Sequence, residues 1–152
     1  MRHFTFFLAI TFLFSCKSET TVLPMKTYYS SNKSFSIDVP INYQLYQETL
    51  PNYMDFRAKD GIITIERKFL MENAAFKKYV KESVTENHQK LHYKEIIASD
   101  TFFHYKMHKG LFTAHEFYMR KIIEGYSYIV TYFDISASDT IAKNIYNSII
   151  AY

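Results

Sequence analysis

An apolar run at the N-terminus divides this chain of 152 residues into a leader and a part that can fold. The run covers the eleven residues from Phe4 to Phe14 and follows a short, positively charged start, Met1 to His3. Because a membrane-spanning helix needs about 20 apolar residues, this run is too short to cross a bilayer. Its length is typical of the apolar region of a secretory signal peptide. The globular part must therefore come from the residues that follow.

The only cysteine of the chain, Cys16, comes directly after this leader. Leu13, Ser15 and Cys16, at the end of an apolar run, resemble the lipobox of bacterial lipoproteins. The resemblance implies a signal peptide at 1–15, cleavage before Cys16, a diacylglycerol on its thiol and an acylated amino terminus. Several acyl chains attach a protein to a membrane stably, whereas one chain does so only reversibly. Cys16 is therefore the predicted lipid attachment site.

Two other interpretations of the N-terminus stay open, a core helix and a plain signal peptide with an incidental cysteine. The run is apolar on every face and stops at a polar stretch, which disfavours a core helix. Lys17 follows the cysteine, in place of the aspartate that resembles an inner-membrane retention signal. The predicted location is therefore the cell envelope, at the outer membrane, with the periplasm or the cell surface around the domain.

The composition excludes several classes of protein. Apolar residues make up 48% of the chain, too many for a wholly disordered protein. A net charge of +3 provides no field for neutralising phosphates, so no nucleic-acid partner is expected. Three glycines and three prolines disfavour a glycine-rich phosphate loop. A single cysteine allows no intramolecular disulfide bond.

The polar stretch after the leader predicts a tether that is followed by one domain. We assign residues 16–26 to the lipidated cysteine and a flexible tether, and residues 27–152 to a single domain. Nine tether residues, 17–25, reach about 30 Å when fully extended. A domain of this size buries roughly two-thirds of its unfolded surface, which is enough for an independent core.

Hydrophobic periodicity predicts strands in the first part of the domain. Residues 34–39 alternate between apolar and polar side chains and are followed by Pro40, as in a half-buried strand. Shorter strands are predicted at 43–48, 52–58 and 62–69. The turn dipeptide Asp60-Gly61 makes the last two a hairpin.

The period changes to that of a helix over 73–90, with Asn73 as its N-cap. Three strands are predicted next, at 101–108 (with a start as early as Tyr93), 111–120 and 126–133. The last has apolar residues on both faces and is expected at the centre of the sheet. A final helix is predicted from Ser136, which starts a sequence similar to a capping box.

This order of elements predicts an α+β fold, an antiparallel sheet with two helices packed on it. Phe35, Ile37 and Pro40 stand in an early strand, and Asn147-Ser148-Ile149 in the last helix. With the hairpin, long helix and meander between them, they resemble the PsbP-like α/β/α sandwich. The resemblance implies a binding or assembly scaffold and no catalytic residue, and no cofactor is predicted.

Histidines are the residues most able to carry chemistry. A hairpin loop at Lys109-Gly110 would pair His104 with His115, and Phe102, Lys106 and His108 would share their face. Two imidazoles about 5 Å apart could share a metal or repel when protonated. Lys106 opposes a metal, and a plain polar sheet face is the expectation.

A second pair, His88 and His92, has zinc-compatible spacing if the helix reaches that far. Two solvated histidines at a fraying helix end are the favoured interpretation, because no third ligand stands at a fixed spacing. No metal site is therefore predicted.

No catalytic motif is found, so the predicted function is non-catalytic: a lipid-anchored module that binds a protein or assists assembly in the cell envelope. Two alternatives stay open. One is a metal-handling or hydrolytic lipoprotein that uses the His104/His115 face. The other is capture of a glycan or small ligand through exposed Tyr and Phe side chains, for example Tyr28, Tyr29, Tyr43 and Tyr46.

Overall fold

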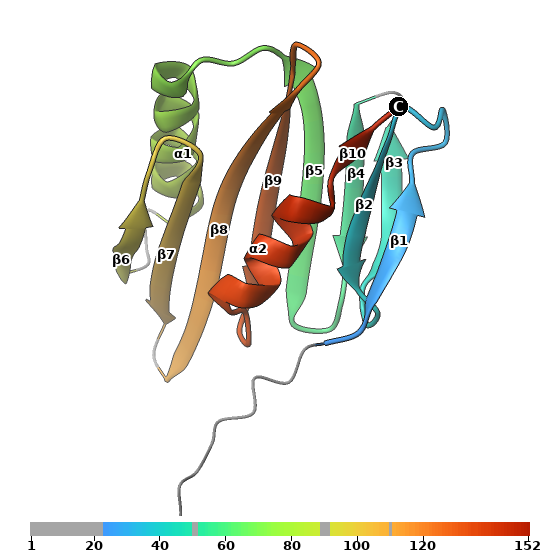
Figure 1. The fold of residues 1–152 in the computed structure, drawn as a ribbon. Helices are drawn as coiled ribbons and strands as arrows, with labels where there is room; N and C mark the ends of the chain where they lie inside the picture. The colour runs from blue at the N-terminus through green and yellow to red at the C-terminus, as the bar shows by residue number, and fades with distance from the viewer. Residues whose placement is uncertain (1–22, 50–51, 89–91, 110) are drawn as a thin grey trace, which may run out of the picture.

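The computed structural model describes residues 23–49, 52–88, 92–109 and 111–152 (Figure 1). Its strands and helices, in chain order, are β1 (Met25–Tyr29), β2 (Phe35–Pro40), β3 (Gln44–Thr49), β4 (Tyr53–Arg57), β5 (Gly61–Phe69), α1 (Asn73–His88), β6 (His92–Ala98), β7 (Phe102–Lys109), β8 (Phe112–Ile123), β9 (Tyr126–Asp134), α2 (Asp139–Ser148) and β10 (Ile150–Ala151). No helix within the described ranges is both long and apolar enough to span a membrane.

The strands form two antiparallel sheets. The larger sheet has seven strands in the order β3-β4-β5-β9-β8-β7-β6, and the smaller has three in the order β1-β2-β10. Strand β9 stands at the centre of the larger sheet, as its two apolar faces predicted. Figure 1 shows α1 behind this sheet, with α2 and the small sheet in front of it. The predicted α+β sandwich with two helices is confirmed, with a small second sheet that the sequence did not predict.

Alternate residues of the same strands build a core on each face of the larger sheet. On the α1 face, Phe76, Val80 and Val84 of the helix pack on side chains of β7, β8 and β9. On the other face, β2 and α2 pack on β4, β5, β8 and β9. Because side chains alternate along a strand, Tyr118 of β8 belongs to the first core and Phe117 to the second.

Two strand predictions change in the structure. The region predicted as one strand from 101, or from as early as Tyr93, forms β6 and β7. A turn separates them, in which the backbone N–H of Phe102 donates to Ser99 Oγ at 2.9 Å. Strand β1 begins at Met25, two residues before the predicted domain start, because its backbone pairs with β2 up to Pro40.

The N-cap residues predicted for both helices differ in the structure. Helix α1 begins at Asn73, but the Asn73 side chain bonds to Asp100 and Arg120 rather than capping the helix. Helix α2 has Ser138 as its N-cap, with Ser138 Oγ accepting from the Ile141 N–H, whereas the sequence predicted Ser136. The Ser136 N–H and hydroxyl donate to Asp134 instead, which moves the helix start by two residues.

Strand register gives the larger sheet two distinct ends. At one end Gly61, His115 and Asp134 lie across from one another, and a hydrogen bond from the Tyr43 hydroxyl to Asp134 joins them to the chain after β2. Because Pro40 pairs with Met25, the chain enters the fold at this end, which we call the tether end. The other end holds Phe69, Tyr126 and Ile123, which also lie across from one another, and we call it the groove end.

Candidate functional site

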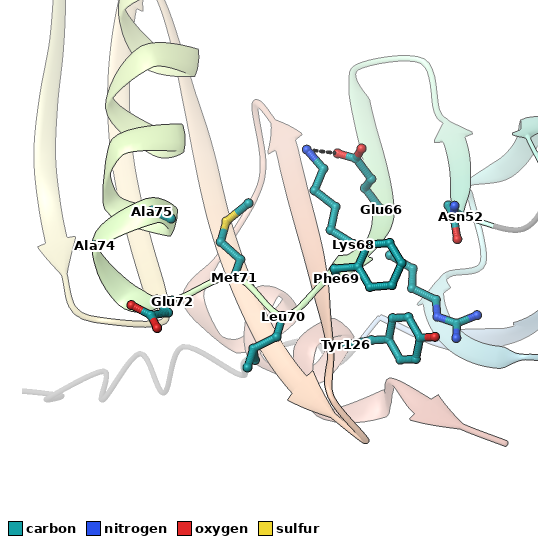
Figure 2. Close-up of a pocket in the computed structure, with 11 residues that line it drawn as sticks. Asn52, Glu66, Lys68, Phe69, Leu70, Met71, Glu72, Ala74, Ala75 and Tyr126 are labelled. Atoms are coloured by element: carbon teal, nitrogen blue, oxygen red, sulfur yellow. Dashed lines mark ion pairs between the residues drawn. The ribbon is translucent and has the colours of Figure 1, made fainter.

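A groove of about 990 Å³ lies at the groove end of the sheet. It is lined by the last residues of β5, the connection to α1, the first turn of α1, Tyr126 of β9 and Asn52. Figure 2 shows Met71 and Ala75 on the side of the helix, and the Phe69 and Tyr126 rings together on the opposite side. Two charged residues of the lining, Glu66 and Lys68, form an ion pair with 2.9 Å between Glu66 Oε2 and Lys68 Nζ.

Unusually exposed apolar side chains border this groove. Phe69 is 84% exposed, although its ring stacks on Tyr126 with centroids 5.9 Å apart. Leu70 is also exposed, and so is Ile122, which lines a smaller hollow with Leu70. Monomeric proteins seldom expose neighbouring large apolar residues without a binding role.

A cation lies beside the aromatic pair. The guanidinium carbon of Arg67 lies 3.9 Å from the centroid of the Tyr126 ring, in a cation–π contact. Within the described residues, no ion pair joins Arg67 to a carboxylate, and its Nε has no hydrogen-bond partner. Aromatic rings and arginine are the residue types enriched at protein interfaces.

A buried arginine fixes the connection that carries the groove. Arg120 of β8 is 1% exposed and donates to the carbonyl oxygen of Met71 and to Asn73 Oδ1. Its guanidinium also lies 5.3 Å from the Phe76 ring. Arg120 therefore joins the end of β5, the start of α1 and the centre of the sheet.

The histidine pair lies at the tether end of the sheet. His104 Nε2 and His115 Nδ1 are 2.8 Å apart, within hydrogen-bond distance. The His104 ring is buried and stacks on Phe117 with centroids 4.2 Å apart. The structure thus brings together the two histidines that the sequence singled out.

The predicted pairing of these strands is wrong by two residues. Lys109 pairs with Phe112, so His104 lies across from Phe117, and His115 across from Lys106. The error came from the position assumed for the loop. Because side chains alternate with a period of two, a shift of two residues keeps both histidines on one face, and they meet diagonally.

A carboxylate that the sequence did not predict completes this cluster. Asp139 Oδ1, at the start of α2, lies 3.0 Å from His104 Nδ1. Neither atom has a hydrogen bond of good geometry, so the contact is electrostatic. No pattern in the sequence shows that α2 docks its first turn over β7, which is why Asp139 was missed.

Burial dominates the electrostatics of the histidine pair. Desolvation lowers the pKa of His104, with a smaller lowering from His115, although Asp139 acts to raise it. Desolvation also lowers the pKa of His115, followed by the positive charge of Lys106. Both imidazoles therefore favour their neutral forms, in which one ring can donate to the other.

The contact between His104 and His115 uses the two ring nitrogens that would otherwise bind a shared metal ion, His104 Nε2 and His115 Nδ1. In the part of the chain that the structure describes, no group of three or more His, Cys, Asp or Glu is placed to hold a metal ion. The other candidate pair does not share a helix face, because α1 ends at His88 and His92 starts β6.

The remaining predicted residues fall in different surroundings. Cys16 lies outside the described residues. The suggested aromatic surface of Tyr28, Tyr29, Tyr43 and Tyr46 is not continuous, because Tyr43 is buried and Tyr28 is half-buried. The Tyr43 hydroxyl instead bonds Asp134, and burial followed by this bond raises the pKa of Tyr43. The exposed aromatic side chain of the groove, Phe69, was not predicted as a site residue.

Comparison with known proteins identifies the fold. No family model and no curated protein matches the sequence. Among solved structures, the chain is similar to the Ran-binding protein Mog1p of Saccharomyces cerevisiae, with a TM-score of 0.57, 9% identity and coverage of 85% of this chain and 96% of that one. It is also similar to the cyanobacterial PsbP protein CyanoP of Synechocystis sp. PCC 6803, with a TM-score of 0.55, 12% identity and coverage of 92% and 99%.

A third solved structure, a protein of Bacteroides thetaiotaomicron VPI-5482, has a TM-score of 0.53 at 11% identity. That match covers 84% of this chain and 48% of the other. The similarity to CyanoP supports the PsbP-like fold that the order of elements indicated. At these identities the comparisons establish the fold alone.

Proposed function

We propose that this chain is a lipid-anchored, non-catalytic module of the bacterial cell envelope that binds a protein partner in the groove. The observation that carries the proposal is the position of the groove. Its exposed apolar residues lie at the end of the sheet opposite Met25, where the chain enters the fold. An anchor attached through the N-terminus would leave this groove accessible.

The chemistry of the groove supports a protein partner rather than a small substrate. The groove combines exposed Phe69 and Leu70 with Arg67, which pairs with no carboxylate among the described residues. Apolar centres with aromatic residues and arginine are typical of protein interfaces. The fold is also that of Mog1p, which is a Ran-binding protein, so this scaffold can serve protein binding.

A capture experiment with paired variants tests the groove. Phe69→Ser and Ile96→Ser each remove one exposed apolar side chain, the first at the groove and the second on β6 at the edge of the sheet. We expect a partner crosslinked in cells to be lost with Phe69→Ser and retained with Ile96→Ser. The purified partner should then bind Phe69→Ser at least about tenfold more weakly than the unchanged protein.

Two results would contradict this assignment. Equal capture by both variants would show that the groove does not bind the partner. Turnover of a substrate by the purified chain, abolished by changes at His104 and His115, would favour the alternative of a hydrolytic lipoprotein. Among the residues that the structure describes, the Phe69 ring stacks on Tyr126. Thermal unfolding of the Phe69→Ser variant checks that loss of this contact leaves the fold intact.

The anchor is tested separately, by mass spectrometry of the protein from its native membrane. We expect a chain that begins at Cys16 and carries the mass of acyl chains, and we expect it in the outer-membrane fraction. Cys16→Ser should remove the added mass. An unmodified Cys16, or a mature chain that still contains Phe4 to Phe14, would contradict the anchoring.

A further inference from the structure

The hairpin between β7 and β8 presents two exposed apolar side chains to solvent. Leu111 is fully exposed, at 102%, and Phe112 is 74% exposed. We call these two residues the hairpin tip. Neither side chain gains the free energy that burial of an apolar surface provides. A surface that covers them is therefore to be expected.

The hairpin tip projects from the tether end of the sheet. Strand β9 ends at Asp134, which pairs with His115 of β8. Strand β8 begins three residues earlier, at Phe112, so the tip extends about 10 Å beyond this pair. Figure 1 shows the hairpin at the same end of the molecule as the start of β1.

Other exposed apolar side chains lie at the ends of strands on this side of the molecule. They lie in or within two residues of strand ends that the register places at the tether end: Leu23, Ile41, Ile62 and Ile135. A cationic side chain accompanies the tip, since Lys106 precedes it on β7. Apolar residues with nearby cations are typical of surfaces that contact anionic lipid headgroups.

We propose that the hairpin tip inserts Leu111 and Phe112 into the surface of the bilayer that holds the lipid anchor. This inference rests on the anchoring proposed above. Only six residues separate Cys16 from Leu23, and they span at most about 20 Å. An anchor at Cys16 therefore keeps the tether end close to the lipid headgroups, within reach of the tip.

Insertion of the tip gives the anchored domain a fixed orientation. A tether alone lets the domain rotate freely, whereas a second contact on the same side holds the tether end against the bilayer. The groove at the opposite end then faces away from the membrane. A polar hairpin would leave the same anchor without an orienting contact, so the identity of residues 111 and 112 carries the proposal.

Vesicle binding without the anchor tests the tip. The chain from residue 16 onward, carrying Cys16→Ser, retains every described residue and lacks the lipid. We expect it to bind vesicles of phosphatidylethanolamine and phosphatidylglycerol, and Leu111→Ser with Phe112→Ser to weaken this binding at least about tenfold. The matched control, Phe69→Ser with Leu70→Ser, removes a similar apolar pair at the groove end and should bind as before.

A fluorescent label reports which end meets the lipid. In the Cys16→Ser chain, Leu111→Cys supplies a unique thiol for an environment-sensitive dye, and Phe69→Cys supplies the control position. We expect a blue shift on adding vesicles for the label at residue 111 and none for the label at residue 69. Circular dichroism checks that each variant keeps its fold.

Three outcomes would overturn the inference. The first is equal vesicle binding by the tip variant and the unchanged chain, and the second is a blue shift at residue 69 instead of 111. The third is concentration-dependent self-association that the tip variant abolishes while vesicles have no effect, which would assign the tip to a second copy. A lipidated Cys16 together with any of these would contradict this inference and leave the proposed anchoring in place.

Discussion

At the scale of single residues, the histidine pair makes the stability of the fold depend on pH. The pKa values of His104 and His115 are both lowered by folding from the ordinary value of 6.5. The unfolded chain therefore binds protons at a higher pH than the folded chain. The free energy of unfolding should fall as the pH drops below about 6.5, by at most about 1.4 kcal/mol per pH unit for each ring.

Urea denaturation at a series of pH values between 7.5 and 5 measures this dependence. Replacing both histidines, as His104→Gln with His115→Gln, should flatten it over this range. His108→Gln removes an exposed imidazole outside the pair and should leave most of the slope in place. A slope unchanged in the double variant would show that other groups control the pH dependence.

The structural role of Gly61 differs from the turn role that the sequence suggests. Next to Asp60 it suggested a turn glycine, yet it is the first residue of β5. A Cβ atom there would overlap the Tyr43 hydroxyl oxygen and would lie 2.6 Å from Asp134 Oδ2. The glycine is needed because these two side chains approach the backbone closely.

Substituting the two described glycines should separate crowding from backbone strain. We expect Gly61→Ala to lower the free energy of unfolding by about 2 kcal/mol or more, through overpacking. Gly125→Ala has free space but a φ of +80°, and it should cost only about 1 kcal/mol. Thermal and urea unfolding measure both, and an equal or smaller effect at Gly61 would contradict the crowding.

At the scale of strands and helices, Arg120 ties β8 to the connection between β5 and α1. Arg120→Met should lower the free energy of unfolding by about 2–4 kcal/mol, because it leaves the Met71 carbonyl and Asn73 without their buried donor. Lys78→Met removes an exposed cation of α1 and should change stability by less than about 0.5 kcal/mol. Similar urea midpoints for the two variants would contradict a structural role for Arg120.

Most elements could be predicted from the sequence, because periodicity records which face of a segment is buried. The hairpin of β4 and β5, the start of α1 and the central strand β9 were predicted correctly. The errors concern contacts between segments distant in the chain. The register of β7 with β8 depends on the loop, and the start of α2 depends on Asp134, which binds Ser136.

The candidate site was less predictable than the fold. Two histidines could be placed on one face because alternation along strands is local. Asp139 and the groove depend on where α2 and α1 dock, and no local pattern encodes this. The exposure of Phe69 is equally hard to predict, since a phenylalanine at the end of a strand usually indicates a core residue.

At the scale of the whole molecule, the two cores should unfold together. They share β8 and β9, whose alternate side chains belong to opposite faces. Val80→Ala on α1 and Val39→Ala on β2 both remove fully buried methyl groups and should each cost about 2 kcal/mol. We expect both to shift one cooperative transition, seen alike by circular dichroism and tyrosine fluorescence. A two-step transition in which Val80→Ala moves only one step would contradict this coupling.

The length of β8 has a further consequence for any partner. This strand runs without interruption over twelve residues, from Phe112 to Ile123, and so measures about 40 Å from one end of the sheet to the other. If the tether end lies on the bilayer, as proposed, the strand is a rigid spacer that sets the height of the proposed binding surface above the lipids. A partner embedded in the same membrane would need an ectodomain of comparable height, whereas a freely diffusing partner would meet no such restriction.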